Sequence, residues 1–251
     1  MNHDAIPVPC PPMKTPHWSR PFLIAVLMLL LVTPGPALAR QAVWVGETLQ
    51  GRPCNDFAGR ETRTNVFDYT DPSDRANHLE IVERAHFTDK VRSLRGGEHQ
   101  SHPLNDLAYT VGRFPNHHGA LYSMIRYATE SLYAREARNA WASVSRGGAF
   151  PPPECYLQRA MDFAPEDHEV RLLAGLYFHR VDAHEQARKA YEKAVSLAPE
   201  SAEVHYNYGL LLLDMKRYTE AREHGAKAYD LGYPLDGLRQ KLAAAGHPID
   251  R

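Results

Sequence analysis

Two successive stretches decide the fold: EVRLLAGLYFHRVDAHEQARKAYEKAVSLAPE at residues 169–200 and EVHYNYGLLLLDMKRYTEAREHGAKAYDLGYP at residues 203–234. When the two are aligned, Gly175 falls on Gly209, an offset of 34 residues. A fixed period of this length indicates a repeated structural unit rather than two unrelated helical hairpins. The same offset relates further small residues, namely Ala187 with Ala221 and Ala194 with Ala228.

The small residues of this repeat stand where two helices are expected to pack closely. A glycine inside a helix costs about 1 kcal/mol relative to alanine, so Gly175 and Gly209 indicate that a neighbouring helix approaches them. Pro199 lies between the two stretches and predicts a chain turn there, because proline removes a helical hydrogen bond. Large side chains fill the remaining space in both repeats: Leu172, Leu173, Leu176, Phe178, Tyr191, Val195, Tyr206, Tyr208, Leu212, Tyr218 and Leu231.

This combination of period, small residues and terminal proline resembles the tetratricopeptide repeat. The resemblance implies an all-α array of about 2.5 to 3.5 helix-turn-helix hairpins with an irregular N-terminal wrap and a C-terminal capping helix. A cap is expected because each stacked repeat leaves an apolar face open. The predicted parts are an irregular segment at 40–100, degenerate repeat-like helices at 101–165 with an insertion around 134–153, two repeats at 166–233, and the capping helix and tail at 234–251.

The N-terminus has the order of a secretory signal peptide. Lys14 and Arg20 precede the apolar segment 22–32, and helix breakers and Ala39 follow it. An apolar helix of this length spans only about 16 Å, which is short of the roughly 30 Å of a bilayer core. We therefore expect residues 1–39 to be removed by cleavage after Ala39 and the protein to be periplasmic or secreted; the alternative is an anchor formed by the uncleaved segment. Met13 is the expected start of translation, since the preceding residues add nothing that a signal peptide needs.

Two cysteines remain after such cleavage, Cys54 and Cys155. An exported protein in an oxidising compartment more often joins such a pair than leaves both thiols free. The competing interpretation is a catalytic thiol, but the sequence has no Cys-x-x-Cys and no histidine beside either cysteine. We expect a disulfide that ties the N-terminal segment to the start of a helix.

Residues 40–100 are rich in turn-forming residues, including Asp71-Pro72, and their apolar runs are short. We expect mostly irregular chain with a short helix in FTDKVRSLRGG, which Thr88 can cap and Gly96 can end. The layout resembles a group of exported bacterial tetratricopeptide-repeat proteins with a DYTDP-like element, an HFT element and FPNH ahead of the repeats. That resemblance implies no particular biochemical role.

Histidines suggest one possible metal site, at His99, His102, His117 and His118 with Glu98 beside them. The spacing HQSH suits two ligands, and zinc favours imidazole, but no complete four-ligand motif is present. Catalytic motifs such as Gly-x-Ser-x-Gly or His-Glu-x-x-His are also missing. We therefore expect no metal, no cofactor and no enzymatic activity; the alternative is an enzyme or metal-binding protein with its site between residues 40–120 and the repeats.

A binding groove is the expected functional site. In tetratricopeptide arrays the first helix of each hairpin lines a concave face that receives a peptide or a partner helix. The resemblance assigns this face to Tyr122, Arg126, Leu172, Leu176, His179, Arg180, Tyr206, Asn207 and Leu210. For the leucines among them, packing between hairpins is the competing interpretation.

The expected function is that of an exported scaffold or adaptor of the cell envelope with a protein or peptide partner. The formal net charge of −1 gives no reason to expect nucleic acid as a partner. No stable membrane span is expected after cleavage. A structural subunit of an envelope assembly, which associates with itself through the repeats, is the remaining alternative.

Overall fold

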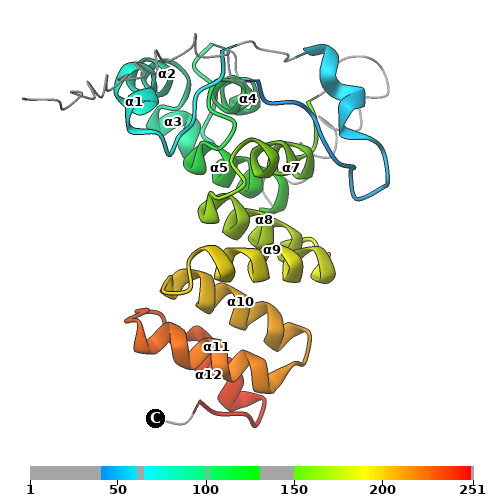
Figure 1. The fold of residues 1–251 in the computed structure, drawn as a ribbon, viewed down its shortest axis with the longest axis vertical. Coiled ribbons are helices and arrows are strands. Elements are labelled where there is room, and N and C mark those ends of the chain that lie inside the picture. The colour runs from blue at the N-terminus through cyan, green and yellow to red at the C-terminus, as the bar shows by residue number, and fades with distance from the viewer. Residues whose placement is uncertain (1–40, 61–64, 100–101, 131–149, 250–251) are drawn as a thin grey trace, which may run out of the picture. The chain divides into compact units, whose positions relative to one another are not determined.

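The computed structural model describes four stretches of the chain, residues 41–60, 65–99, 102–130 and 150–249. Their secondary structure is helical, apart from one isolated bridge between Glu47 and Pro53. The predicted all-α fold is therefore confirmed (Figure 1). The signal peptide predicted at 1–39 and most of the insertion predicted around 134–153 lie outside the described residues.

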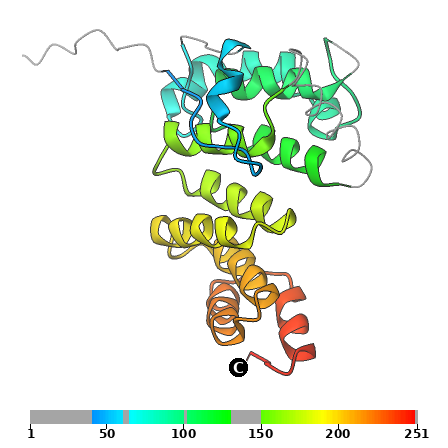
Figure 2. The same cartoon turned by 90° about the vertical axis from the view of Figure 1, so that its right-hand side faces the viewer.

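The two predicted repeats form the hairpins α8 (His168–Arg180) with α9 (His184–Leu197) and α10 (Ala202–Asp214) with α11 (Tyr218–Asp230). Figures 1 and 2 show them stacked in chain order. Both first helices begin at a capping side chain: the Asp167 carboxylate accepts from the N–H groups of Glu169 and Val170, and the Ser201 hydroxyl accepts from Val204.

The two hairpins turn in the same way. Asp182 and Lys216 both have φ of 59°, in the left-handed region that closes a helix end. The N–H of the residue after each one, Ala183 and Arg217, donates to a carbonyl of the preceding helix over 2.8 Å. Lys216 follows Asp182 by one repeat period, so the backbone conformation has the same period as the sequence.

Close helix packing explains the small residues. A Cβ on Gly175 would lie 2.6 Å from the Tyr191 ring of α9, and one on Gly209 would lie 2.6 Å from a Leu238 methyl group. The paired alanines are fully buried, as their alignment predicted: Ala187, Ala194, Ala221 and Ala228. The predicted reason for the glycines, a neighbour too close for a side chain, is confirmed.

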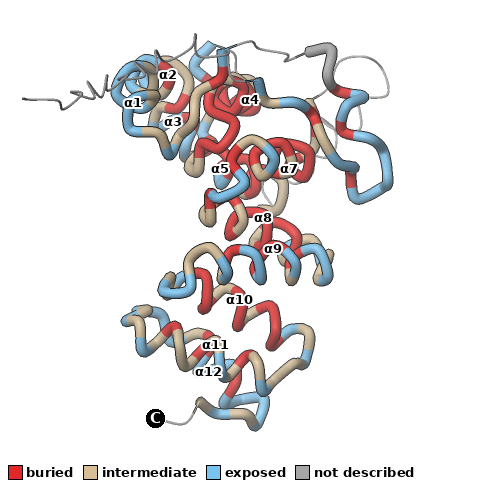
Figure 3. The backbone as a smooth tube through the Cα atoms, viewed as in Figure 1, coloured by how far each residue is buried: buried red, intermediate tan, exposed pale blue. Residues whose placement is uncertain are grey.

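Ahead of the repeats lie α4 (Pro103–Arg113), α5 (His118–Thr129) and α7 (Pro153–Phe163). Among the described contacts, α5 packs on α4, α7 and α8, and α7 packs on α8. Figure 3 shows these helices to be the most buried part of the described chain. Ile125, which stands where the full repeats have glycine, is completely buried in this core.

The N-terminal segment is more helical than predicted. Instead of mostly irregular chain, a continuous helical run contains α1 (Pro72–Asp74), a π-helical stretch (Arg75–Leu79) and α2 (Glu80–His86), and α3 (Asp89–Arg92) follows. Asp71 caps this run by accepting from the N–H groups of Ser73 and Asp74. Asp-Pro is a turn signal, but it also suits a helix start with proline at the first position, and here the helix forms.

The disulfide Cys54–Cys155 is present, as predicted, and joins the N-terminal segment to the start of α7. Other contacts hold the same segment along this helix. Arg159 donates to the carbonyl of Ala42 over 3.0 Å, and its guanidinium lies 4.8 Å from the centre of the Trp44 ring. The N-terminal segment is thus held against α7 by one disulfide and by the polar contacts of Arg159.

The predicted capping helix is α12 (Gly237–Ala244). Leu238 and Leu242 are completely buried where α12 packs on α10 and α11. None of the helices in the described stretches combines the length and the apolar character needed to cross a bilayer.

Candidate functional site

The first-helix face is the side of the array formed by α5, α8 and α10, on which the predicted groove residues lie. These helices are direct neighbours, since α8 packs against both α5 and α10. Three side-chain contacts cross from helix to helix on this face and are described next. The three helices α5, α8 and α10 therefore form one continuous face.

Tyr122 and Arg180 form the most accessible part of this face. Tyr122 on α5 is 41% exposed, and among the described residues of α5, α8 and α10 it is the only exposed large apolar one. Arg180, at the end of α8, places its guanidinium 6.0 Å from the centre of that ring and donates to the Thr129 hydroxyl over 3.3 Å. An exposed aromatic ring beside a weakly engaged cation is suited to binding another molecule.

Hydrogen bonds within the protein hold the other polar side chains of this face in place. His179 of α8 lies 2.8 Å from the Asp214 carboxylate of α10. Arg126 makes two hydrogen bonds, of 2.6 and 3.2 Å, to Glu130, the residue that follows α5. Asn207 donates to the backbone carbonyl of Glu203. Leu176 and Leu210 are half-buried.

Two predicted groove residues are not available on the surface. Leu172 is 4% exposed and packs in the core, which agrees with packing between hairpins as the competing interpretation. Tyr206 is 7% exposed, because its ring stacks on Tyr233 at 4.1 Å and meets Tyr229 edge-on. The prediction that Tyr206 lines an accessible groove is therefore wrong, because Tyr229 of α11 and Tyr233 after it cover the ring.

Comparison with known families identifies the scaffold that carries this face. Two tetratricopeptide repeat family models match, one over residues 168–201 and the other over residues 190–223. Residues 168–223 are therefore similar to tetratricopeptide repeats. The matches cover α8, α9, α10 and the start of α11, so they include two of the three helices of the face. Tetratricopeptide repeats suggest a role in protein–protein interaction. Among curated proteins, none has a sequence that matches this chain significantly.

A partly buried polar group, the Asn116 junction, fastens the N-terminal segment to the start of α8. It consists of Asp68, Asn116, His118 and Asp167. The Asn116 amide nitrogen donates to Asp68 over 2.8 Å and to Asp167 over 3.0 Å, and its oxygen accepts from the N–H of Tyr69. His118 bonds to Asp167 over 2.8 Å. One carboxylate thus caps α8 and also holds two side chains from the preceding region.

The DYTDP, HFT and FPNH elements meet beside this junction. His117 of FPNH is 1% exposed and contacts the rings of Tyr69 and Phe87, which belong to the other two elements. Its Nε2 lies 3.1 Å from Glu83, whereas its Nδ1 accepts from the N–H of Ala120. Burial lowers the pKa of His117, and the hydrogen bond from His117 lowers the pKa of Glu83. The three elements are therefore parts of one packed unit.

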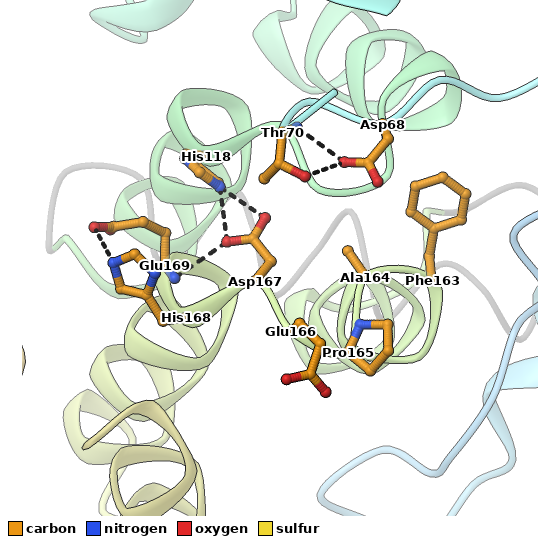
Figure 4. A pocket seen from close by; sticks show the side chains of 10 residues that line it. All are labelled: Asp68, Thr70, His118, Phe163, Ala164, Pro165, Glu166, Asp167, His168 and Glu169. Carbon is orange, nitrogen blue, oxygen red and sulfur yellow. Dashed lines mark hydrogen bonds and ion pairs between the residues drawn. The ribbon is translucent and has the colours of Figure 1, made fainter. Parts of the chain in front are cut away.

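An open pocket of about 350 Å³ lies next to the junction (Figure 4). Figure 4 shows Asp68 and Thr70 on one side and the chain from Phe163 to Glu169 on the other. The carboxylates of Asp68 and Asp167 already accept hydrogen bonds from neighbouring side chains. The side chains of the junction are therefore engaged with one another, which indicates a structural role.

The histidines predicted as one possible metal site do not come together. His102 lies 2.7 Å from the Tyr127 hydroxyl, His117 bonds to Glu83, and His118 bonds to Asp167. His117 and His118 are neighbours in sequence but face different partners, because His117 is the extended N-cap of α5 whereas His118 is its first helical residue. Among the described residues, His99 is the only one of the four that lies in a group of potential metal ligands, together with His86 and Asp106.

Proposed function

We propose that this protein is an exported adaptor of the cell envelope that binds a peptide or a partner helix on its first-helix face. The observation that carries the proposal is Tyr122, which remains 41% exposed, whereas Tyr206, the other predicted tyrosine of the groove, is 7% exposed. Tyrosine and arginine are the residues that most often dominate binding energy at protein interfaces. Tyr122 and Arg180 lie together, so a partner can engage both at once.

The chemistry of the face favours a particular ligand. An apolar side chain of the partner can pack on Tyr122, as a helix or peptide does in a groove. A carboxylate next to it can pair with Arg180, which otherwise makes a hydrogen bond of 3.3 Å to a hydroxyl. The ligand we propose is therefore an amphipathic segment that carries an acidic residue beside an apolar one.

Export is supported by two features. The N-terminal sequence has the order of a cleavable signal peptide, and the Cys54–Cys155 disulfide suits an oxidising compartment. In this proposal the protein catalyses no reaction and needs no cofactor for binding. N-terminal sequencing of the mature protein tests the export: we expect the chain to begin at Arg40, and a chain that keeps the apolar segment contradicts cleavage.

Crosslinking followed by mass spectrometry in the native cell tests the binding face. We expect wild-type protein to capture a specific partner, and Tyr122→Ala and Arg180→Glu each to reduce its recovery at least tenfold. Lys189→Glu is the matched control, because it makes the same charge change on an exposed position of α9, outside the face. Equal capture by the wild-type and face variants refutes this site. If Lys189→Glu reduces partner recovery to the same extent, the effect results from overall charge and not from this face.

A further inference from the structure

A second cluster of functional side chains lies at the N-terminal end of the described helices, away from the first-helix face. Asp106 on α4 is buried, with 1% of its surface exposed. One of its carboxylate oxygens, Oδ1, lies 2.8 Å from Nδ1 of His86 and 3.0 Å from Nδ1 of His99. The other oxygen accepts from the N–H of Glu98 over 2.8 Å. The end of α2, the chain before α4 and α4 itself therefore converge on one carboxylate.

The two imidazole rings are held in place. His86 stacks on the ring of Tyr109 with centroids 3.7 Å apart, and His99 stacks on His86 at 4.4 Å. The His86 side chain is 17% exposed and that of His99 is 58% exposed, so the cluster has a buried side and a side open to solvent. Because the rings are held in place and one side of the cluster is open to solvent, an ion has ordered ligands and a route of entry.

The hydrogen bonds of the cluster also suit an ion. The Asp106 carboxylate accepts from both histidines, so each of them donates through Nδ1–H. An ion that binds there takes the place of these two protons. Each ring then carries its proton on Nε2 and stays a neutral ligand.

The ligand atoms already have nearly the spacing of a metal site. All three lie within 4.8 Å of one another. A tetrahedral ion with bonds of about 2.0–2.1 Å separates its ligand atoms by about 3.3 Å. The two separations to Asp106 Oδ1, 2.8 and 3.0 Å, are within a few tenths of an ångström of that value. A small outward movement of the rings is enough to admit an ion.

We propose that His86, His99 and Asp106 bind a divalent transition-metal ion, with zinc the best match, and leave a fourth position on the solvent side for water. Two imidazoles and one carboxylate are a ligand set that zinc accepts. Glu98 does not supply the fourth ligand in this arrangement, because its carboxylate accepts from the Thr88 hydroxyl over 2.6 Å. The open position distinguishes the site from a closed structural zinc site.

Titration of untagged, EDTA-treated protein with Zn²⁺ by calorimetry, and with Co²⁺ by visible absorption, tests the site. We expect one equivalent to bind and the Co²⁺ spectrum to show intense bands of tetrahedral coordination. His99→Ala should lower the affinity of this equivalent at least tenfold and abolish the bands. Since His99 is the exposed ligand, this variant should fold normally, which circular dichroism checks.

Two matched histidine variants complete the design. His168→Ala removes a histidine whose side chain is 39% exposed, and His102→Ala removes the neighbour in the HQSH sequence that bonds to Tyr127 instead. Both should retain the affinity and the Co²⁺ bands of the wild type. The proposal is overturned if His99→Ala binds as tightly as the wild type, or if the wild type shows no tetrahedral Co²⁺ bands. Loss in His102→Ala but not in His99→Ala assigns the metal to other ligands and equally overturns it.

Discussion

Replacement of Gly175 by alanine tests the packing that defines the repeat. The new Cβ would lie 2.6 Å from Cδ1 and Cε1 of Tyr191, and 2.8 Å from its Cζ. Favourable contacts between carbon atoms need about 3.5–4.0 Å, so the ring or the helix has to move by about 1 Å. Tyr191 is completely buried and stacks on Tyr208, which leaves little room for the movement.

The expected magnitude is the balance of two effects. Alanine gains about 1 kcal/mol over glycine in a helix interior, whereas overpacking a core costs about 1–3 kcal/mol. Since the obstacle is a buried ring rather than the end of a flexible chain, we expect the free energy of unfolding to fall by about 1–2 kcal/mol.

Gly209→Ala is the matched control. It makes the same change at the equivalent position, where the close atom is a methyl group of Leu238 that can rotate away, and the next contacts are 3.4 Å or longer. We expect this variant to lie within about 1 kcal/mol of the wild type. Urea unfolding followed by circular dichroism measures both, with midpoints and slopes compared because repeat arrays can unfold in parts. Stabilisation of Gly175→Ala equal to that of Gly209→Ala would refute the close approach of α8 and α9.

Three further predictions concern stability. Reduction of the Cys54–Cys155 disulfide, which closes a sequence separation of 101 residues, should lower the free energy of unfolding by about 2–5 kcal/mol in urea titrations with and without reductant; unchanged midpoints contradict this. Burial, with the nearby His205, lowers the pKa of His224 to about 4, against about 6.5 in an unfolded chain. The unfolded state therefore binds more protons below pH 6.5, so stability should fall from pH 6.5 towards pH 4, and His224→Leu should weaken this dependence in urea titrations at both pH values. Asn116→Asp places a third carboxylate between two others and should cost about 3 kcal/mol at pH 7, with a smaller difference from the wild type at pH 4, where carboxylates begin to take up protons. An equal difference at both pH values argues against carboxylate repulsion.

The repeat could be predicted from the sequence because its determinants are local and periodic. Gly175 and Gly209 mark the close approaches, and Pro199 marks the turn between them. Each signal depends on residues within one or two helices, so the spacing along the chain carries the information. The capping helix was equally predictable, since the exposed apolar face of a last repeat has to be covered.

The remaining features depend on contacts between residues far apart in the chain. The burial of Tyr206 results from Tyr233, which follows α11, and helical spacing alone places the same side chain on the first-helix face. The histidine spacing HQSH suggested a pair, but His99 joins His86 and Asp106 because α2 continues as a helix up to His86. The helix before it was missed because Asp-Pro was interpreted as a turn. The interpretation of Asp-Pro as a turn therefore hid both the helix α2 and the cluster of His86, His99 and Asp106.

The two proposed sites can fail independently, since they use different residues and elements. The first-helix face is built from α5, α8 and α10, and the metal cluster from α2, α4 and the chain before α4. The two sites are connected through α5, which packs on α4, and through α3, whose Arg92 carbonyl accepts from Ser123 of α5 over 3.3 Å. The His99 side chain is 58% exposed and takes part in neither of these contacts, so we expect His99→Ala to leave partner capture through Tyr122 unchanged. A joint loss would show that α3 or α4 transmits a change from one site to the other.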